Sequence, residues 1–85
     1  MPTDRPTSTW RVRTPADLGR VIAGVRRERG LSQGRLAAEL GFERSYLSEL
    51  ESGETTIALE RTLRALRRLG AEITVTLPDA HGNRQ

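Results

Sequence analysis

The residues with the most informative chemistry lie near the middle of the chain. Five of them stand at the start and on the outer side of a short helix expected over residues 44–52: Arg44, Ser45, Tyr46, Ser48 and Glu49. Arginine presents a planar fork of donors that suits phosphate oxygens and guanine edges, whereas a glutamate accepts from cytosine or repels phosphate. This group therefore predicts a surface that contacts DNA. An ordinary solvated helix face is the alternative.

Gln33 and Arg35 lie in the first turn of a preceding helix, expected over residues 33–40 with Ser32 as its cap. The first turn of a helix has backbone N–H groups without intrahelical acceptors, and these groups attract anions. Both residues are therefore candidate DNA-binding residues, with Gln33 on a phosphate. The alternative for Gln33 is a solvated polar side chain that follows a cap.

The composition is compatible with a polyanionic partner and disfavours catalysis. All 14 basic residues are arginine, and the formal net charge is +3. The chain has no cysteine, and its one histidine, His81, lies in a polar tail. Glu49 and Glu51 are two residues apart on a helix, so they point in different directions and form no catalytic pair. We therefore expect no enzymatic activity, no cofactor and no metal site.

The length of 85 residues supports one domain and leaves it short of buried surface. A chain of this size buries only about 60% of its unfolded surface, so a partner subunit is expected. Residues 1–12 contain no signal-peptide pattern, and no apolar run approaches the roughly 18 residues that span a membrane. We expect a soluble cytoplasmic protein without a membrane partner.

The segment from Gln33 to Leu50 has the steric pattern of two short helices joined by a tight turn. Ala37 is a small residue where the helices would cross, and Gly41 tolerates the positive φ that the turn requires. Four aliphatic residues would fill the angle between the helices: Leu36, Leu40, Leu47 and Leu50. The pattern predicts a helix-turn-helix within a mostly α bundle of four to five helices.

Two longer helices flank this unit. The first begins at Thr14, which with Asp17 forms a capping box around Pro15. The other is expected over residues 57–69. Its outer side has four arginines, for which a contact with DNA or a protein partner and an ordinary solvated face both remain open: Arg61, Arg64, Arg67 and Arg68.

Ile73, Val75 and Leu77 alternate with polar residues and predict a half-buried strand. The chain offers no second strand of comparable quality, and Thr9–Arg13 is the one rival. Pairing with the same strand of a second subunit would satisfy its backbone, so these three residues are expected at a homodimer interface. A dimer of helix-turn-helix units needs half-sites about 34–36 Å apart, hence a palindromic operator.

Two stretches resemble the phage-repressor class of DNA-binding domains, also called the Cro/cI or xenobiotic-response-element class. They are Arg-Gly-Leu-Ser-Gln at 29–33 and Tyr-Leu-Ser-Glu-Leu-Glu-Ser-Gly at 46–53. The resemblance covers about residues 14–69. It implies a bundle of four or five helices whose third helix enters the major groove.

The same resemblance implies roles for single residues. Arg44, Ser45 and Glu49 match positions that face base edges, and the two positions that face the groove wall or the backbone match Tyr46 and Ser48. It also implies a partly buried structural ion pair between Arg26 and Glu51.

The ends of the domain resemble HipB-type antitoxins, through Thr-Pro-Ala-Asp-Leu at 14–18 and Glu-Ile-Thr-Val-Thr-Leu at 72–77. In that family the strand pairs across a dimer, and the antitoxin binds operator DNA and a HipA-type serine/threonine kinase toxin. The resemblance implies a repressor that controls its own operon, with such a toxin as partner, at the nucleoid of a bacterium. The alternatives are a stand-alone repressor or restriction-modification controller, and a kinase-inhibiting module that binds DNA weakly.

These features divide the chain into four expected parts. They are a flexible arm (1–13), a helix-turn-helix domain (14–70), a dimerising strand (71–78) and a disordered tail (79–85). The role of Trp10 within the arm stays open.

Overall fold

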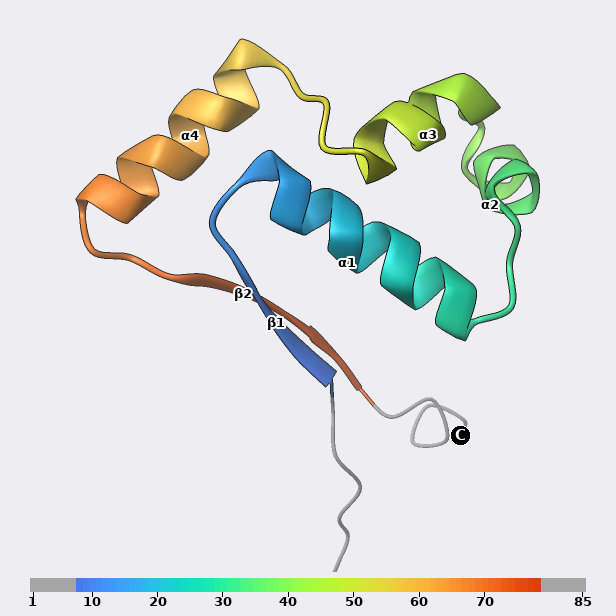
Figure 1. Ribbon diagram of the computed structural model, residues 1–85, viewed down its shortest axis with the longest axis horizontal. Helices are drawn as coiled ribbons and strands as arrows, with labels where there is room; N and C mark the ends of the chain where they lie inside the picture. The colour runs from blue at the N-terminus through green and yellow to red at the C-terminus, as the bar shows by residue number, and fades with distance from the viewer. Residues whose placement is uncertain (1–7, 79–85) are drawn as a thin grey trace, which may run out of the picture.

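Four helices and a two-stranded sheet form residues 8–78, the part of the chain that the computed structural model describes (Figure 1). The elements in chain order are β1 (Ser8–Val12), α1 (Pro15–Glu28), α2 (Gln33–Leu40), α3 (Arg44–Glu51), α4 (Ile57–Arg68) and β2 (Ile73–Leu77). α1 lies at the centre, with α3 and α4 on one side of it (Figure 1). This arrangement confirms the predicted small, mostly helical bundle with a C-terminal strand.

Side-chain caps fix where the helices begin. The Thr14 hydroxyl accepts from the Asp17 amide at 3.1 Å, and the Asp17 carboxylate accepts from the Thr14 amide at 3.1 Å, which completes the predicted capping box of α1. The hydroxyls of Ser32 and Thr56 cap α2 and α4 in the same way, at 3.0 and 3.2 Å. Each cap satisfies an amide that the helix itself leaves without an acceptor.

The turn between α2 and α3 contains a glycine with a positive φ, as predicted. Gly41 adopts a left-handed conformation with φ of 76°, where a side chain would be strained. Ala37 is 2% exposed and Leu47 is 1% exposed, so both are buried in a unit in which α2 packs on α3 and α3 packs on α1. Leu40 was expected in the angle between the helices, but it is 50% exposed. It is the last residue of α2, and none of the described elements covers it.

A second group of buried residues joins α1 to α4 and the sheet. Val12, Val21 and Leu63 are buried together. Six half-buried residues surround them: Trp10, Leu18, Val25, Leu59, Ile73 and Val75. α1 therefore contributes to both buried groups and connects the helix-turn-helix to the rest of the chain.

The N-terminal segment differs from the predicted flexible arm, because Ser8–Val12 forms β1. It pairs antiparallel with β2, with Trp10 opposite Val75 and Val12 opposite Ile73. β2 was expected to pair with its copy in a second subunit, but one of its edges is satisfied within the chain. The physical reason is that Trp10 and Val12 add apolar side chains to the same side of the sheet. Residues 1–7 and the expected disordered tail (79–85) lie outside the described part.

The helices are spread out rather than closely gathered. The radius of gyration is 14.8 Å, whereas a compact domain of this length has about 11 to 12 Å. α4 buries only Leu63, while Ile57 and Leu69 at its two ends are 63% and 78% exposed. A single chain therefore leaves much apolar surface of α4 in water. Within residues 8–78, no helix has the length and apolar character needed to cross a membrane.

Candidate nucleic-acid interface

The outer side of α3 presents an uninterrupted set of polar side chains. Leu47 faces α1 and is buried, while the remaining candidate residues of this helix are all exposed: Arg44, Ser45, Tyr46, Ser48 and Glu49. Arg44 occupies the first position of α3, at the tip of the helix. The structure thus places these five side chains on one protruding helix that is held from behind by Leu47.

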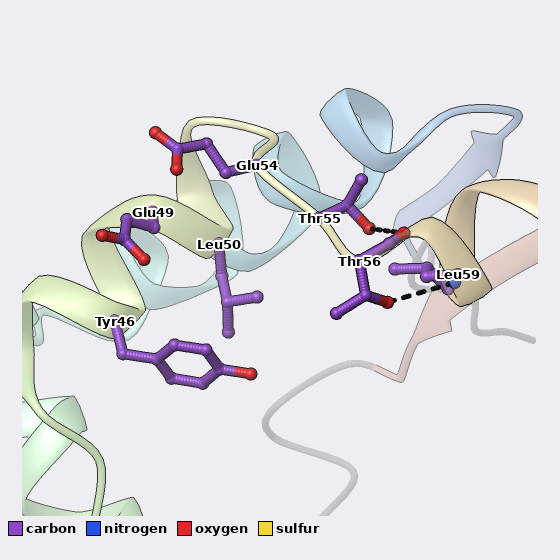
Figure 2. Close-up of a pocket in the computed structure, with 7 residues that line it drawn as sticks. All are labelled: Tyr46, Glu49, Leu50, Glu54, Thr55, Thr56 and Leu59. Atoms are coloured by element: carbon purple, nitrogen blue, oxygen red, sulfur yellow. Dashed lines mark hydrogen bonds between the residues drawn. The ribbon is translucent and has the colours of Figure 1, made fainter.

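Tyr46 belongs to a shallow groove beside α3 as well as to its surface. Its ring meets the Phe42 ring edge-on, with centroids 5.3 Å apart, across the turn that joins α2 to α3. Figure 2 shows Tyr46 and Leu50 directed into the space between α3 and the start of α4. The groove has a volume of about 300 Å³, and Glu49 and Glu54 lie among its lining residues. Tyr46 therefore contacts protein on one side of its ring and solvent on the other.

Sequence reasoning missed this groove, because it depends on how α4 is placed. The missed lining residues are Leu50, Glu54, Thr55, Thr56 and Leu59. Leu50 and Leu59 both fit helical apolar patterns, which predict burial without saying which helices meet. No local signal could have shown that a gap remains between them.

A network of hydrogen bonds connects α1, α2 and α3 on the inner side of α3. Arg26 Nε and Nη2 donate to the two carboxylate oxygens of Glu51 at 2.6 and 3.1 Å, and Arg26 Nη1 donates to the Leu31 carbonyl at 2.8 Å. The ion pair between α1 and α3 is therefore present and nearly buried. Hydrogen bonds from Arg26 and Gln33 hold the pKa of Glu51 below its usual value, against burial, and Glu51 raises the pKa of Arg26.

Gln33 is the third member of this network. Its side-chain amide donates to Glu51 Oε1 at 2.9 Å, whereas a phosphate contact was expected. The backbone amides of Gln33 and Gly34 remain in the first turn of α2, where a helix supplies no acceptor. Any anion contact at this position therefore uses the backbone amides or the second N–H of the Gln33 side-chain amide. Arg35, the other candidate on α2, is exposed and pairs with Glu39 at 3.1 Å.

The network predicts a loss of stability in acid that depends on Glu51. The folded-state pKa of Glu51 is lower than its usual 4.5. Its contribution to stability is therefore complete above about 4.5 and is lost as the pH falls through the lower folded pKa. We expect Glu51→Gln to be less stable than wild type at neutral pH and less sensitive to acid. Unfolding free energies from urea titrations between pH 3 and 7 would measure both effects.

Asp17→Asn is the matched control. The pKa of Asp17 is also lowered, mainly because its carboxylate accepts a hydrogen bond from the Arg13 amide. Asp17 belongs to the cap of α1 and not to the Glu51 network. On acidification, each of the two variants should lose less unfolding free energy than wild type does. If wild type and Glu51→Gln lose stability in parallel on acidification, the Glu51 network does not contribute as described.

Close backbone contact fixes α3 against α1. A Cβ built on Gly19 would lie 2.5 Å from the carbonyl oxygens of Leu50 and Glu51. At the end of α3, Gly53 has a φ of 95°, and a Cβ there would lie 2.9 Å from the Ala16 Cα. Sequence reasoning missed Gly19, although a glycine inside an apolar helix is a signal of close packing. These glycines set how far α3 projects from the bundle.

Comparisons with known proteins agree with this geometry. Residues 17–76 match the family model described as helix-turn-helix domain. The uncharacterized HTH-type transcriptional regulator y4mF of Sinorhizobium fredii is 35% identical over 68 residues, which cover 80% of this chain and 90% of that protein. No solved structure matches at a comparable level. The family model spans most of the chain, including α2, the Gly41 turn and α3. The protein therefore belongs to the helix-turn-helix domain family.

Proposed function

We propose that the protein is a sequence-specific DNA-binding transcriptional regulator that acts as a homodimeric repressor. The observation that carries this proposal is the α2–α3 unit. Its inner residues Ala37 and Leu47 are buried, while the outer side of α3 is polar and exposed along its whole length. A helix of this kind fits the major groove, which admits one α-helix and displays a distinct pattern for each base pair.

Within this proposal the candidate residues have separate roles. Arg44, at the exposed tip of α3, would donate to a guanine edge, and Ser45 and Glu49, also exposed, would be further base-facing residues. Ser48 lies one turn after Arg44 on the same side, and Tyr46 lies at the edge of this surface. Both would face the groove wall or the DNA backbone. The first turn of α2, with Gln33 and Arg35, approaches a phosphate.

Replacing Arg44 with alanine tests the role of α3. We expect Arg44→Ala to weaken binding to the protein's own promoter by about 1–3 kcal/mol and to change binding to random DNA much less, because a base contact is specific. Titrations of both DNAs by electrophoretic mobility shift would measure the two affinities. Arg35→Ala, an exposed arginine on α2, is the control and should weaken both DNAs alike. Equal losses for Arg44→Ala on both DNAs would remove it as a base reader.

We infer a homodimer from the uncovered surface of α4. Ala58, Thr62, Ala65 and Leu69 follow one another along the same side of α4, and all four are exposed. Small residues at this spacing allow another helix to approach closely, and a second copy would cover Leu69. The sheet also has unpaired outer edges, since β1 and β2 pair only with each other within residues 8–78. Both surfaces offer places for a two-fold partner.

The three strand residues predicted at the dimer interface remain candidates for it. Ile73, Val75 and Leu77 are each half-buried, so their own chain covers only part of their apolar surface. A second subunit that pairs with the free edge of β2 would bury the remainder. The dimer would then recognise a palindromic operator with half-sites about 34–36 Å apart.

The antitoxin role is the finer part of the proposal. Its support is the resemblance of residues 14–18 and 72–77 to HipB-type antitoxins, segments that form the start of α1 and strand β2 here. We propose a HipA-like serine/threonine kinase toxin as partner, with autoregulation of the shared operon in the bacterial cytoplasm. Co-purification of the protein with the product of an adjacent kinase-like gene would test this. A protein with normal operator binding and no such neighbour would be a stand-alone regulator.

A further inference from the structure

The helix-turn-helix of this protein is itself acidic. Between Gln33 and Glu51, two arginines stand against four glutamates, which gives a formal net charge of −2. Much of the affinity of proteins for DNA comes from cations that replace counterions on the phosphates. A DNA-binding role for α2 and α3 therefore requires positive charge from another element of the fold.

α1 and the sheet supply less of that charge, because three of their four arginines are paired. Arg20 pairs with Asp17 at 2.6 Å, and Arg26 pairs with Glu51 at 2.6 Å. On β1, Arg11 lies 3.9 Å from the Glu72 carboxylate. Among the described residues 8–78, these pairs leave Arg27 as the one arginine of α1 and β1 with no carboxylate within ion-pair distance.

α4 has the opposite character. The segment Ile57–Arg68 contains four arginines and one glutamate, a formal net charge of +3. Arg67 donates through Nη1 to the Arg13 carbonyl and so holds the end of α4 against the chain after β1. The other three arginines are exposed, and no carboxylate of the described residues lies within ion-pair distance of them: Arg61, Arg64 and Arg68.

These three arginines form one stripe on the outer side of α4. Their directions lie about 100° to 160° around the helix from Leu63, the residue that α4 buries against the core, and the stripe is about 10 Å long. α3 and α4 lie on the same side of α1 (Figure 1). Because Leu47 and Leu63 are buried, the opposite faces of α3 and α4 are both turned away from the core.

We propose that Arg61, Arg64 and Arg68 form a second DNA-contacting surface, which binds the phosphate backbone beside the segment that α3 occupies. This inference depends on the DNA-binding function proposed above. The arginine stripe provides the positive charge that the acidic helix-turn-helix lacks. Because phosphates contain no sequence information, the stripe strengthens binding to operator and random DNA alike, while α3 selects the sequence.

The test is the salt dependence of DNA binding by the full chain with Arg61, Arg64 and Arg68 all changed to glutamine. Each phosphate contact contributes about 0.9 to the slope of log affinity against log salt, so we expect the slope to become shallower by about 2 to 3 per bound subunit. A fourfold increase in salt would then weaken wild type roughly 20- to 60-fold more than the variant, per subunit. The same change is expected on promoter and random DNA.

A second triple variant removes the same charge elsewhere, with Arg11, Arg20 and Arg27 changed to glutamine. These exposed arginines lie on β1 and α1, outside α3 and α4. Circular dichroism would verify that both triple variants are folded. A smaller slope change in this control supports the α4 surface. Equal slope changes in the two triple variants, or a wild-type slope in the α4 triple variant, would overturn the proposal for the α4 surface. Neither result would contradict the DNA-binding function. A wild type that binds no promoter DNA would overturn the function itself.

Discussion

Gly19→Ala is expected to lower the free energy of unfolding by about 3 kcal/mol, the upper end for an overpacked site. The added methyl would lie 2.5 Å from two backbone carbonyl oxygens of α3, those of Leu50 and Glu51. A flexible side chain could move away, but these carbonyls belong to the last turn of α3. The helix must therefore shift as a unit. Since small domains are stable by only about 5–15 kcal/mol, this one methyl removes a large share of the total.

Gly24→Ala is the matched control on the same helix. A Cβ on Gly24 would meet no atom within 4 Å, so the only effect is the higher helix propensity of alanine. We expect this variant to be more stable by roughly 0.5–1 kcal/mol. Urea unfolding of both variants followed by circular dichroism would measure the difference. Two variants of equal stability would show that α1 and α3 do not approach as closely as described.

Leu69→Glu is expected to convert the proposed dimer to monomers and to reduce operator affinity about 100-fold or more. Leu69 is 78% exposed at the end of the uncovered side of α4, so a charge there costs the single chain little. In a dimer the same carboxylate would be buried without a partner, which is strongly unfavourable. Loss of the dimer removes the gain from holding two half-sites together, which amounts to about 10²–10⁴.

Sedimentation at micromolar concentration and operator titrations would measure these two effects. Thr9→Glu, which adds the same charge on the exposed outer face of β1, should leave both unchanged. If Leu69→Glu sediments as wild type does, then α4 is not part of a dimer interface. The free edges of the sheet would then be the remaining candidate surface.

The features that could be predicted from the sequence are those fixed by neighbouring residues. The Thr14–Asp17 capping box, the Ser32 cap and the left-handed Gly41 each act within a few residues. They give the bounds of the helices without knowledge of the rest of the chain. Burial of Ala37 at the crossing follows from the same local pattern.

The features that could not be predicted depend on contacts between distant residues. β1 is only five residues long and follows a segment that contains proline and threonine, so its sequence alone is a weak strand signal. The strand forms because it pairs with β2, which lies far away in the sequence. The bond from Gln33 to Glu51 joins residues 18 apart, and it changes which atoms of Gln33 are left for a phosphate. The exposure of Leu40 depends on the position of α3 relative to α2, and helical periodicity alone does not determine that position.

The central claim is that the exposed row on α3 recognises one DNA sequence. Its most direct test is the ratio of two wild-type affinities, for the protein's own promoter and for a shuffled fragment of equal length and composition, at the same salt concentration. We expect the promoter to bind about 1,000-fold more tightly or better, as specific DNA sites do. Equal affinities for the two fragments would contradict it.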